Sequence, residues 1–230
     1  MTDSGAMAAE LRMEHKPSAR ERLIVALDVP GKDEALRLVH ELDGLVTFYK
    51  VGLELLMRGG IEDLIRALAR DKQVFLDLKL PGDIDETVRR AVQLAADMGV
   101  TFLTLSATSD PLTIRAARAG RGDARLPKLL FVSYLSSRDE ADYQAAHPRS
   151  EVSFEAFVTG RAQMALESGC DGLIASGDVI RTLRGAFPHA IIVSPGIRPA
   201  GAGADDHKRS STPSAAISMG ADYLVVGRPI

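Results

Sequence analysis

The chain has 230 residues, of which 46% are hydrophobic and 26% are charged, and its formal net charge at pH 7 is −3. These values are typical of a globular protein with one sizeable core, and they lack the basic excess of nucleic-acid-binding or membrane-surface proteins. Cys170 is the only cysteine, which excludes an internal disulfide and favours a reducing compartment, so we expect a cytoplasmic protein. The sequence contains no apolar run of the roughly 20 residues that span a bilayer, and no metal-binding motif.

Short apolar strands alternate with amphipathic helices along most of the chain. Residues 1–18 are polar and mixed in charge, so we expect a flexible tail there and a single domain over 19–230. The predicted strands cover 23–28, 46–50, 74–78, 101–106, 128–133, 172–175, 190–194 and 223–226. The predicted helices cover 33–42, 53–56, 61–69, 85–98, 111–119, 154–168, 178–186 and a segment from 212 onward, with a polar connection over 134–151.

Eight strands in strict alternation with helices predict an α/β fold, a (β/α)8 TIM barrel. A doubly wound open sheet is the alternative, and in both folds ligands bind at the carboxyl ends of the strands. The chain stops at Ile230, directly after the eighth strand, where a barrel normally adds a final helix. We therefore expect a barrel that lacks this helix, with a partner covering the surface, or a sequence that is part of a longer chain.

Charged residues interrupt the third strand at its carboxyl end. Asp77 and Lys79 are two residues apart, so their side chains point to the same face of the strand. Pro81 and Gly82 end the strand, and Asp83 stands where a helix N-cap is expected. A structural ion pair beside a helix cap would give the same pattern. Strands one, two and four also end in polar residues, at Asp28, Lys50 and Ser106.

Alternating carboxylates and amines at one rim have a specific chemical use. Flanking carboxylates favour the protonated form of a lysine. A lysine held in this way is a general acid or stabilises a developing carbanion. A carboxylate aimed at the carboxylate of a substrate would repel it and favour the loss of CO2.

The segments after strands seven and eight predict a phosphate site. Residues 194–198 read Ser-Pro-Gly-Ile-Arg, and residues 226–228 read Val-Gly-Arg. Glycine lets backbone N–H groups approach phosphate oxygens, and arginine adds charge-assisted contacts. Turn glycines beside surface arginines are the alternative interpretation. The glycine-rich segment 195–211 is suited to closing over a ligand.

Six segments, taken together and in order, resemble the orotidine 5′-phosphate decarboxylase family. They are Ile24–Val29, Lys50–Glu54, Phe75–Lys79, Asp83–Val88, Ser194–Pro199 and Asp222–Ile230. The resemblance implies a homodimeric barrel that converts orotidine 5′-phosphate to UMP, the last step of pyrimidine biosynthesis, with no metal or organic cofactor. Hexulose-phosphate synthases and keto-gulonate-phosphate decarboxylases share the Asp-x-Lys pattern.

The resemblance implies roles for individual residues of the charged rim. Lys79 would protonate C6 of the pyrimidine as CO2 leaves, and Asp77 would lie against the departing carboxylate. Asp28 and Lys50 would bind ribose hydroxyls and complete the charge network. Asp83 and Thr87 would reach into the site of the neighbouring subunit. The positions that match the pyrimidine and phosphate contacts of the family are Ser136, Pro195, Arg198, Gly227 and Arg228.

The sequence departs from the family pattern at three places. Three residues, not two, separate Lys79 from Asp83, which puts the placement of Asp83 in question. Ser106 replaces a histidine after strand four, and we assign it no catalytic role. His207 stands where a glutamine bridges phosphate and base, and it is either a ligand contact or a solvated loop residue.

Two other functions remain open on the sequence alone. One is a different phosphosugar lyase of the same superfamily, which would act on a sugar phosphate and require magnesium. The other is a nucleotide-binding barrel without catalytic activity. The intact Asp77 and Lys79 pair favours catalysis over the second alternative.

Overall fold

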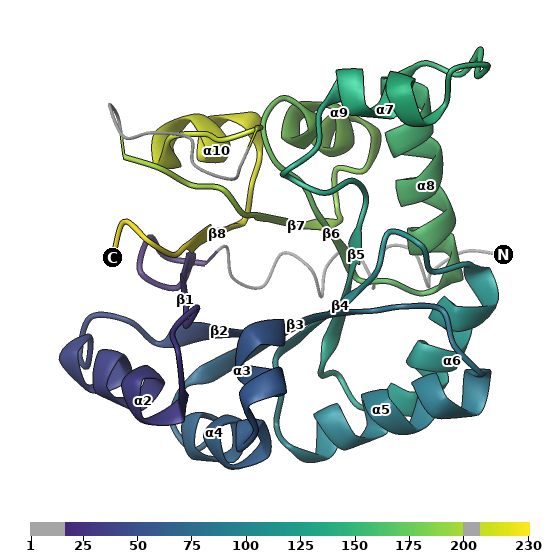
Figure 1. The fold of residues 1–230 in the computed structure, drawn as a ribbon. Helices are drawn as coiled ribbons and strands as arrows, with labels where there is room; N and C mark the ends of the chain where they lie inside the picture. Colours follow the sequence, from purple (N-terminus) through teal and green to yellow (C-terminus); the bar gives the residue numbers. More distant parts are fainter. Residues whose placement is uncertain (1–16, 200–207) are drawn as a thin grey trace, which may run out of the picture.

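The computed structural model describes residues 17–199 and 208–230 as a closed barrel of eight parallel strands (Figure 1). The strands are β1 (Leu23–Ala26), β2 (Phe48–Gly52), β3 (Gln73–Leu80), β4 (Phe102–Leu105), β5 (Lys128–Val132), β6 (Gly172–Ile174), β7 (Ile191–Ser194) and β8 (Tyr223–Val226). The helices are α2 (Lys32–Glu41), α3 (Leu53–Arg58), α4 (Ile61–Leu68), α5 (Asp85–Asp97), α6 (Pro111–Arg121), α7 (Glu140–Ala146), α8 (Phe154–Ser168), α9 (Val179–Ala186) and α10 (Pro213–Met219).

Closure of the barrel confirms the predicted TIM fold and excludes the open sheet. Each strand pairs with the next one in the sequence, and β1 pairs with β8 through Leu23 opposite Leu224. The helices surround the ring of strands, as Figure 1 shows. Residues 227–230 follow β8 without a further helix. Most of the predicted tail, residues 1–16, lies outside the described residues, so the division into tail and domain stays a prediction.

Aromatic side chains fill the interior of the barrel toward the amino ends of the strands. Phe102 is central among them, because its ring centroid lies 5.0 Å from that of Phe48, 5.9 Å from Phe75 and 5.1 Å from Tyr223. Successive inward positions on a strand are two residues apart. The next inward positions after Phe48 and Phe75 are Lys50 and Asp77, and they face the interior at the carboxyl ends of the strands.

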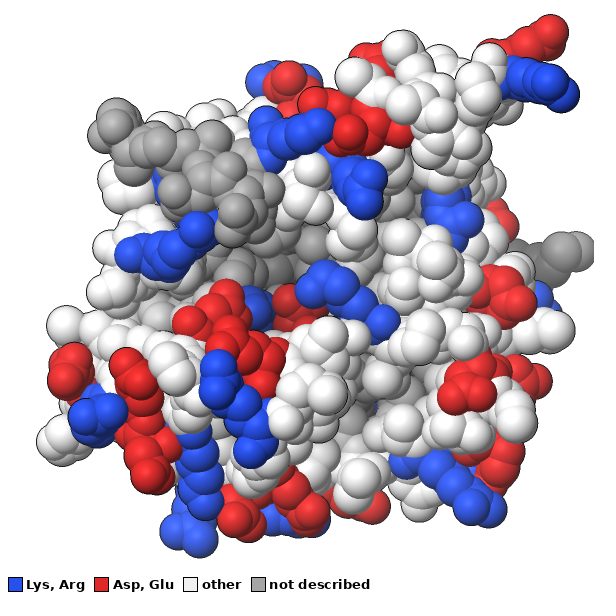
Figure 2. Space-filling model, viewed as in Figure 1, with Lys and Arg blue, Asp and Glu red and all other residues white. Residues whose placement is uncertain are grey.

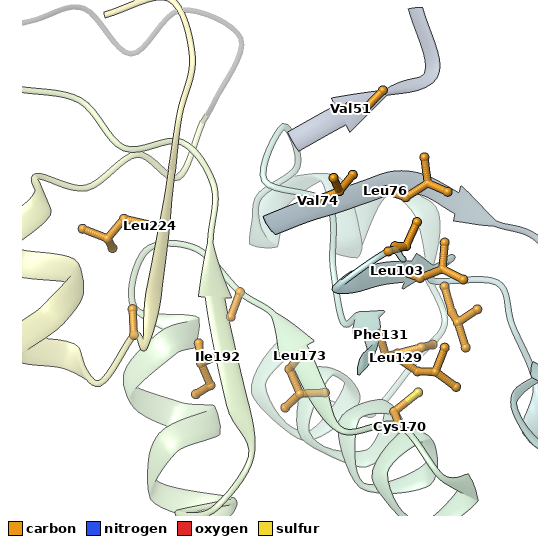
Figure 3. Close-up of a cluster of buried hydrophobic side chains, with 14 of the residues drawn as sticks. Val51, Val74, Leu76, Leu103, Leu129, Phe131, Cys170, Leu173, Ile192 and Leu224 are labelled. Carbon is orange, nitrogen blue, oxygen red and sulfur yellow. The ribbon is translucent and has the colours of Figure 1, made fainter. Parts of the chain in front are cut away.

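A second apolar layer separates the barrel from its helices. It contains outward-facing strand residues such as Val51, Leu103, Leu173 and Leu224, which are buried against the surrounding helices (Figure 3). Cys170 belongs to this layer, and burial raises the pKa of its thiol above the ordinary value. It is therefore a small buried apolar residue in this fold, not a reactive thiol.

Two aspartates secure the amino ends of neighbouring strands. Asp222, just before β8, accepts a hydrogen bond of 2.8 Å from the backbone N–H of Ile192 and one of 2.6 Å from Arg184. Asp171, just before β6, accepts hydrogen bonds from the backbone N–H of Leu129 and from the guanidinium of Arg121. Each carboxylate thus links a strand to the preceding strand and to an outer helix.

The connection predicted over 134–151 contains a short helix that the prediction missed. Asp139 and Asp142 form a reciprocal capping box at the start of α7, and Tyr143 on this helix is buried. The segment is polar because it is mostly exposed, and this polarity masked its helical pattern. The predicted start of α10 is confirmed, since Thr212 caps the helix and Pro213 occupies its first turn.

Candidate active site

A cavity of about 550 Å³ opens at the carboxyl ends of the strands. Acidic and basic side chains gather around a hollow near the middle of the face shown in Figure 2. Nine of the predicted site residues line this cavity: Asp28, Lys50, Asp77, Lys79, Ser136, Pro195, Arg198, Gly227 and Arg228. The structure thus brings together residues from β2 and β3 and from the segments that follow β1, β5, β7 and β8.

Lys50 and Lys79 share the carboxylate of Asp77. The Lys79 Nζ atom lies 2.9 Å from both carboxylate oxygens of Asp77, and Lys50 Nζ lies 3.6 Å from Oδ2. Lys50 also donates a hydrogen bond of 2.9 Å to Asp28. The result is a continuous chain of alternating charge across β1, β2 and β3, as the sequence predicted.

Asp77 is ionised in this arrangement although it is buried. Its side chain is 14% exposed, and burial on its own would raise its pKa. The positive charges of Lys50 and Lys79, with hydrogen bonds from Lys79 and Thr104, outweigh burial and hold the pKa of Asp77 below its ordinary value of 3.8. A fixed negative charge therefore lies beside the two ammonium groups.

The local structure of β3 explains how both Asp77 and Lys79 face the cavity. Asp77 follows Phe75 on the inner face of the strand, but the strand becomes irregular between Leu76 and Leu80. Lys79 has a φ of +50°, a left-handed conformation that is uncommon for residues other than glycine. This distortion sets the position of the lysine, which simple strand alternation alone does not determine.

Gly52 makes room for the ion pair between Lys50 and Asp28. A Cβ atom at this position would lie 3.3 Å from Lys50 Nζ and 3.5 Å from Asp28 Oδ1. Glu54, two residues further on, also lines the cavity and pairs with Arg58 at 2.9 Å. The sequence interpretation assigned no role to either residue, although both lie in the segment that follows Lys50.

The phosphate-site residues after β7 and β8 occupy one side of the cavity. Gly196 has a φ of +75°, which favours glycine, and Arg198 is buried with its Nη1 donating to the carbonyl of Ile197. Gly227 and Arg228 follow β8 directly and line the same cavity. The backbone of residues 196–198 is tied to Ser211 by two hydrogen bonds, which close the base of the segment 195–211.

Ser136 reaches the cavity from the segment after β5. Arg209 holds this segment, because its guanidinium donates to the carbonyls of Tyr134 and Leu135 at 3.0 and 2.9 Å. The backbone N–H of Arg209 also donates to the carbonyl of Ser136 at 3.3 Å. The base of the segment after β7 therefore positions the segment that carries Ser136, a link that the sequence interpretation missed.

Asp83 and Thr87 are exposed and do not line the cavity of their own chain. The prediction that Asp83 caps α5 is wrong. Ile84 is the N-cap, and the Asp83 carboxylate accepts a hydrogen bond of 2.6 Å from the Ile84 N–H without capping the helix. Of the three residues between Lys79 and Asp83, Leu80 ends β3 and pairs with Leu105, while Pro81 and Gly82 are exposed. Lys79 therefore lies within β3, whereas Asp83 lies in the exposed stretch 81–84 that follows the strand.

The two remaining departures from the family pattern are Ser106 and His207. Ser106 is hydrogen-bonded to Thr108 at 2.9 Å and is not part of the cavity lining. His207 lies outside the described residues, so its predicted contact stays a prediction. Within residues 17–199 and 208–230, no group of three or more metal-ligating side chains is found.

Comparisons with known proteins agree with this geometry. The profile of the Orotidine 5'-phosphate decarboxylase / HUMPS family matches residues 21–230. An orotidine 5'-phosphate decarboxylase of Rhodopseudomonas palustris (strain BisA53) is 49% identical over 214 residues, which are 92% of this chain and 88% of the relative. An orotidine 5'-phosphate decarboxylase of Bradyrhizobium diazoefficiens is 45% identical over 212 residues, 92% of this chain and 87% of the relative.

Solved structures show the same likeness in three dimensions. The crystal structure of orotidine 5'-phosphate decarboxylase from Lactobacillus acidophilus superposes with a TM-score of 0.76, at 33% identity and 90% coverage of each chain. An uncharacterized protein from Geobacillus kaustophilus gives a TM-score of 0.74 at 30% identity, again with 90% coverage of each chain. The chain described here belongs to the orotidine 5'-phosphate decarboxylase family.

Proposed function

We propose that this protein works as a homodimeric orotidine 5′-phosphate decarboxylase with its active sites at the subunit interface. The chain is a carboxy-lyase of UMP biosynthesis that releases CO2 from orotidine 5′-phosphate. The observation that carries the mechanism is the array in which the Asp77 carboxylate lies between the ammonium groups of Lys50 and Lys79.

Lys79 supplies the proton in the proposed reaction. As the bond between C6 and the carboxylate breaks, its electron pair remains on C6 and CO2 departs. The nearby ammonium stabilises this developing negative charge and then transfers a proton to C6. Lys79 is left neutral and regains its proton from solvent, which its partly exposed side chain can reach.

Asp77 has two effects on this step. Its negative charge favours the protonated form of Lys79 and keeps the ammonium aimed into the cavity. A substrate carboxylate placed beside it meets a second negative charge in a partly buried site, and this repulsion is relieved when CO2 forms. Lys50 limits the repulsion and, with Asp28, binds the ribose hydroxyls.

The opposite side of the cavity binds the 5′-phosphate. Arg198 and Arg228 supply positive charge, while Gly196 and Gly227 allow the backbone to approach the phosphate oxygens. Segments after strands seven and eight are the usual phosphate site of TIM barrels. Ser136 contacts the pyrimidine, and Pro195 contacts the ligand beside the phosphate arginines. The predicted ligand contact of His207 lies outside the described residues.

A second subunit completes the site in this proposal. Asp83 and Thr87 are exposed at the rim beside the cavity and are available to a neighbouring chain. Exposed apolar side chains follow three adjacent strands at the same rim. They are Leu53 and Met57 after β2, Ile84 after β3 and Leu112 after β4. Burial of such a patch favours association of two copies through one self-complementary face.

The described helices are too short or too polar for any of them to cross a membrane. We place the enzyme in the cytoplasm. The support for this location is its cysteine usage, since the single residue Cys170 is a buried free thiol.

The activity is tested by following the absorbance of orotidine 5′-phosphate after addition of the protein, with and without EDTA. Metal-independent formation of UMP is the expected result. Turnover of a hexulose or keto-gulonate phosphate that requires magnesium would instead assign the chain to a related phosphosugar lyase. Tight UMP binding without any turnover would identify a nucleotide-binding barrel that has lost catalysis.

A further inference from the structure

The hydroxyl group of Thr104 contacts both residues of the central ion pair. Thr104 lies on β4 and is fully buried. Its Oγ1 atom donates a hydrogen bond of 2.9 Å to Asp77 Oδ1 and accepts one of 2.9 Å from the backbone N–H of Lys79. One hydroxyl has one proton to donate and lone pairs to accept, so both bonds are satisfied at once.

This hydroxyl also fills the irregularity in β3. Leu76 pairs with Leu103 and Leu80 pairs with Leu105, so three residues of β3 stand opposite Thr104 alone. A regular strand would pair one residue there. The backbone N–H of Lys79 is bonded to the Thr104 side chain instead of a strand carbonyl, in the stretch where Lys79 adopts a φ of +50°.

We infer that Thr104 is a positioning residue for decarboxylation, which holds the Asp77 carboxylate and the Lys79 backbone in their catalytic arrangement through its single hydroxyl. Thr104 does not line the cavity, so it acts through these two residues and does not touch the substrate. The inference rests on the proposed function, because it assigns Thr104 a part in the same reaction.

The surroundings of Asp77 show why this contact matters. The charged groups that face Asp77 are Lys50 on β2 and Lys79 on its own strand, and Lys50 leads on to Asp28 on β1. Thr104 is the contact that β4 makes with this carboxylate, and it is uncharged. Without the hydroxyl, Asp77 would be free to rotate toward the lysines, and the left-handed backbone at Lys79 would lose the bond that holds it.

Two matched variants separate positioning from packing. Thr104→Val keeps the shape of the side chain but removes both hydrogen bonds, whereas Thr104→Ser keeps the hydroxyl and loses only a methyl group. We expect Thr104→Val to lower kcat about 10- to 100-fold, the scale of a small misplacement of catalytic groups. KM should change by less than about threefold, because the phosphate and ribose contacts remain. Thr104→Ser should retain kcat to within about threefold of the unmutated enzyme.

A second measurement, independent of turnover, follows the Asp77 carboxyl carbon by NMR during an acid titration without ligand. The Thr104 hydrogen bond helps to lower the pKa of Asp77. In Thr104→Val, Asp77 should therefore become protonated at a higher pH than in the unmutated protein. In Thr104→Ser, Asp77 should titrate as in the unmutated protein. If the unmutated protein fails to convert orotidine 5′-phosphate, the proposed function is wrong, and the titration still tests whether Thr104 controls Asp77.

Two results would overturn the inference. One is a Thr104→Val variant with unchanged kcat and an unchanged Asp77 titration, even if its melting temperature falls, because that result describes a packing residue. The other is a Thr104→Ser variant as slow as Thr104→Val at equal melting temperature, because the hydroxyl would then not be the important group.

Discussion

The Nζ atom of Lys79 lies 2.9 Å from each carboxylate oxygen of Asp77, two positions earlier on the same strand. In a regular strand both side chains would point into the barrel but stand roughly 6 to 7 Å apart along it. The pairing of β3 with β4 is irregular over this stretch, between Leu76 and Leu80. The central contact of the site therefore lies within a local distortion of the barrel, where Lys79 has a φ of +50°.

The charge on Asp77 should make the stability of the protein depend on pH. The folded-state pKa of Asp77 lies below its ordinary value of 3.8, so its ionised form stabilises the fold above that value. This contribution is lost as the pH falls through the folded-state pKa. Asp77→Asn should therefore have a lower melting temperature than the unmutated protein at neutral pH, and the difference should shrink below about pH 4. A difference in melting temperature between the two proteins that stays constant down to about pH 2 would show that the charges of Lys50 and Lys79 do not stabilise the ionised form of Asp77.

Arg228→Ala should weaken the binding of UMP about 10- to 100-fold, because a charge-assisted contact to phosphate contributes roughly 1.5 to 3 kcal/mol. Uridine, which has no phosphate, should bind the variant and the unmutated protein equally well. Isothermal titration calorimetry with both ligands measures the two effects. Arg66→Ala is a suitable control, since this arginine pairs with Glu62 on the outer surface of α4. Equal affinity of the unmutated protein for uridine and UMP would contradict the phosphate site.

A shared active site predicts complementation between two inactive variants. Lys79→Ala and Asp83→Ala should each be inactive or strongly impaired alone. After subunit exchange in an equal mixture, half of the dimers are mixed and each has one intact site, so about a quarter of the activity should return. A mixture of Lys79→Ala with Asp77→Ala serves as the control, because both residues line the cavity of one chain. No recovery in the first mixture would place Asp83 outside the partner's site.

Asp222 should be important for stability but not for chemistry. Its removal leaves the Ile192 N–H and the Arg184 guanidinium without their carboxylate partner at the amino end of the barrel. Asp222→Ala should lower the free energy of unfolding by about 1 to 3 kcal/mol, and the melting temperature by roughly 2 to 4 °C for each kcal/mol. The activity of the folded variant at 25 °C should be unchanged. Calorimetry of Asp222→Ala, with the surface variant Glu62→Ala as the control, measures the change in melting temperature. A melting temperature of Asp222→Ala equal to that of the unmutated protein would refute the prediction.

The fold was predictable because alternation of short apolar strands with amphipathic helices is a local pattern. The side chains at the ends of β1, β2 and β3 were predictable for the same reason, since Asp28, Lys50 and Asp77 continue the inward series of their strands. Thr104 belongs to the same series, two positions after Phe102, but the polar residue noted on strand four is Ser106, which ends the apolar run. The period of two along a strand was the signal that could have identified Thr104.

Other features could not be predicted because they depend on contacts between distant segments. The left-handed backbone at Lys79 lies where β3 pairs irregularly with β4. The hydrogen bonds from Arg209 to the carbonyls of Tyr134 and Leu135 join segments some 75 positions apart. The position of Asp83 depends on the conformation of the exposed stretch 81–84. Its role depends on a second chain, whose surface a single sequence does not specify.

The most direct test of the proposed mechanism compares Lys79→Ala with the unmutated protein for both turnover of orotidine 5′-phosphate and affinity for UMP. Lys79 is the proposed proton donor, while ribose and phosphate are held by other residues. We expect decarboxylation to become undetectable while UMP binding weakens by no more than about tenfold. Lys32→Ala, which changes a surface lysine paired with Asp63, should leave both quantities unchanged. Near-normal turnover by Lys79→Ala would contradict the assignment of Lys79 as the proton donor.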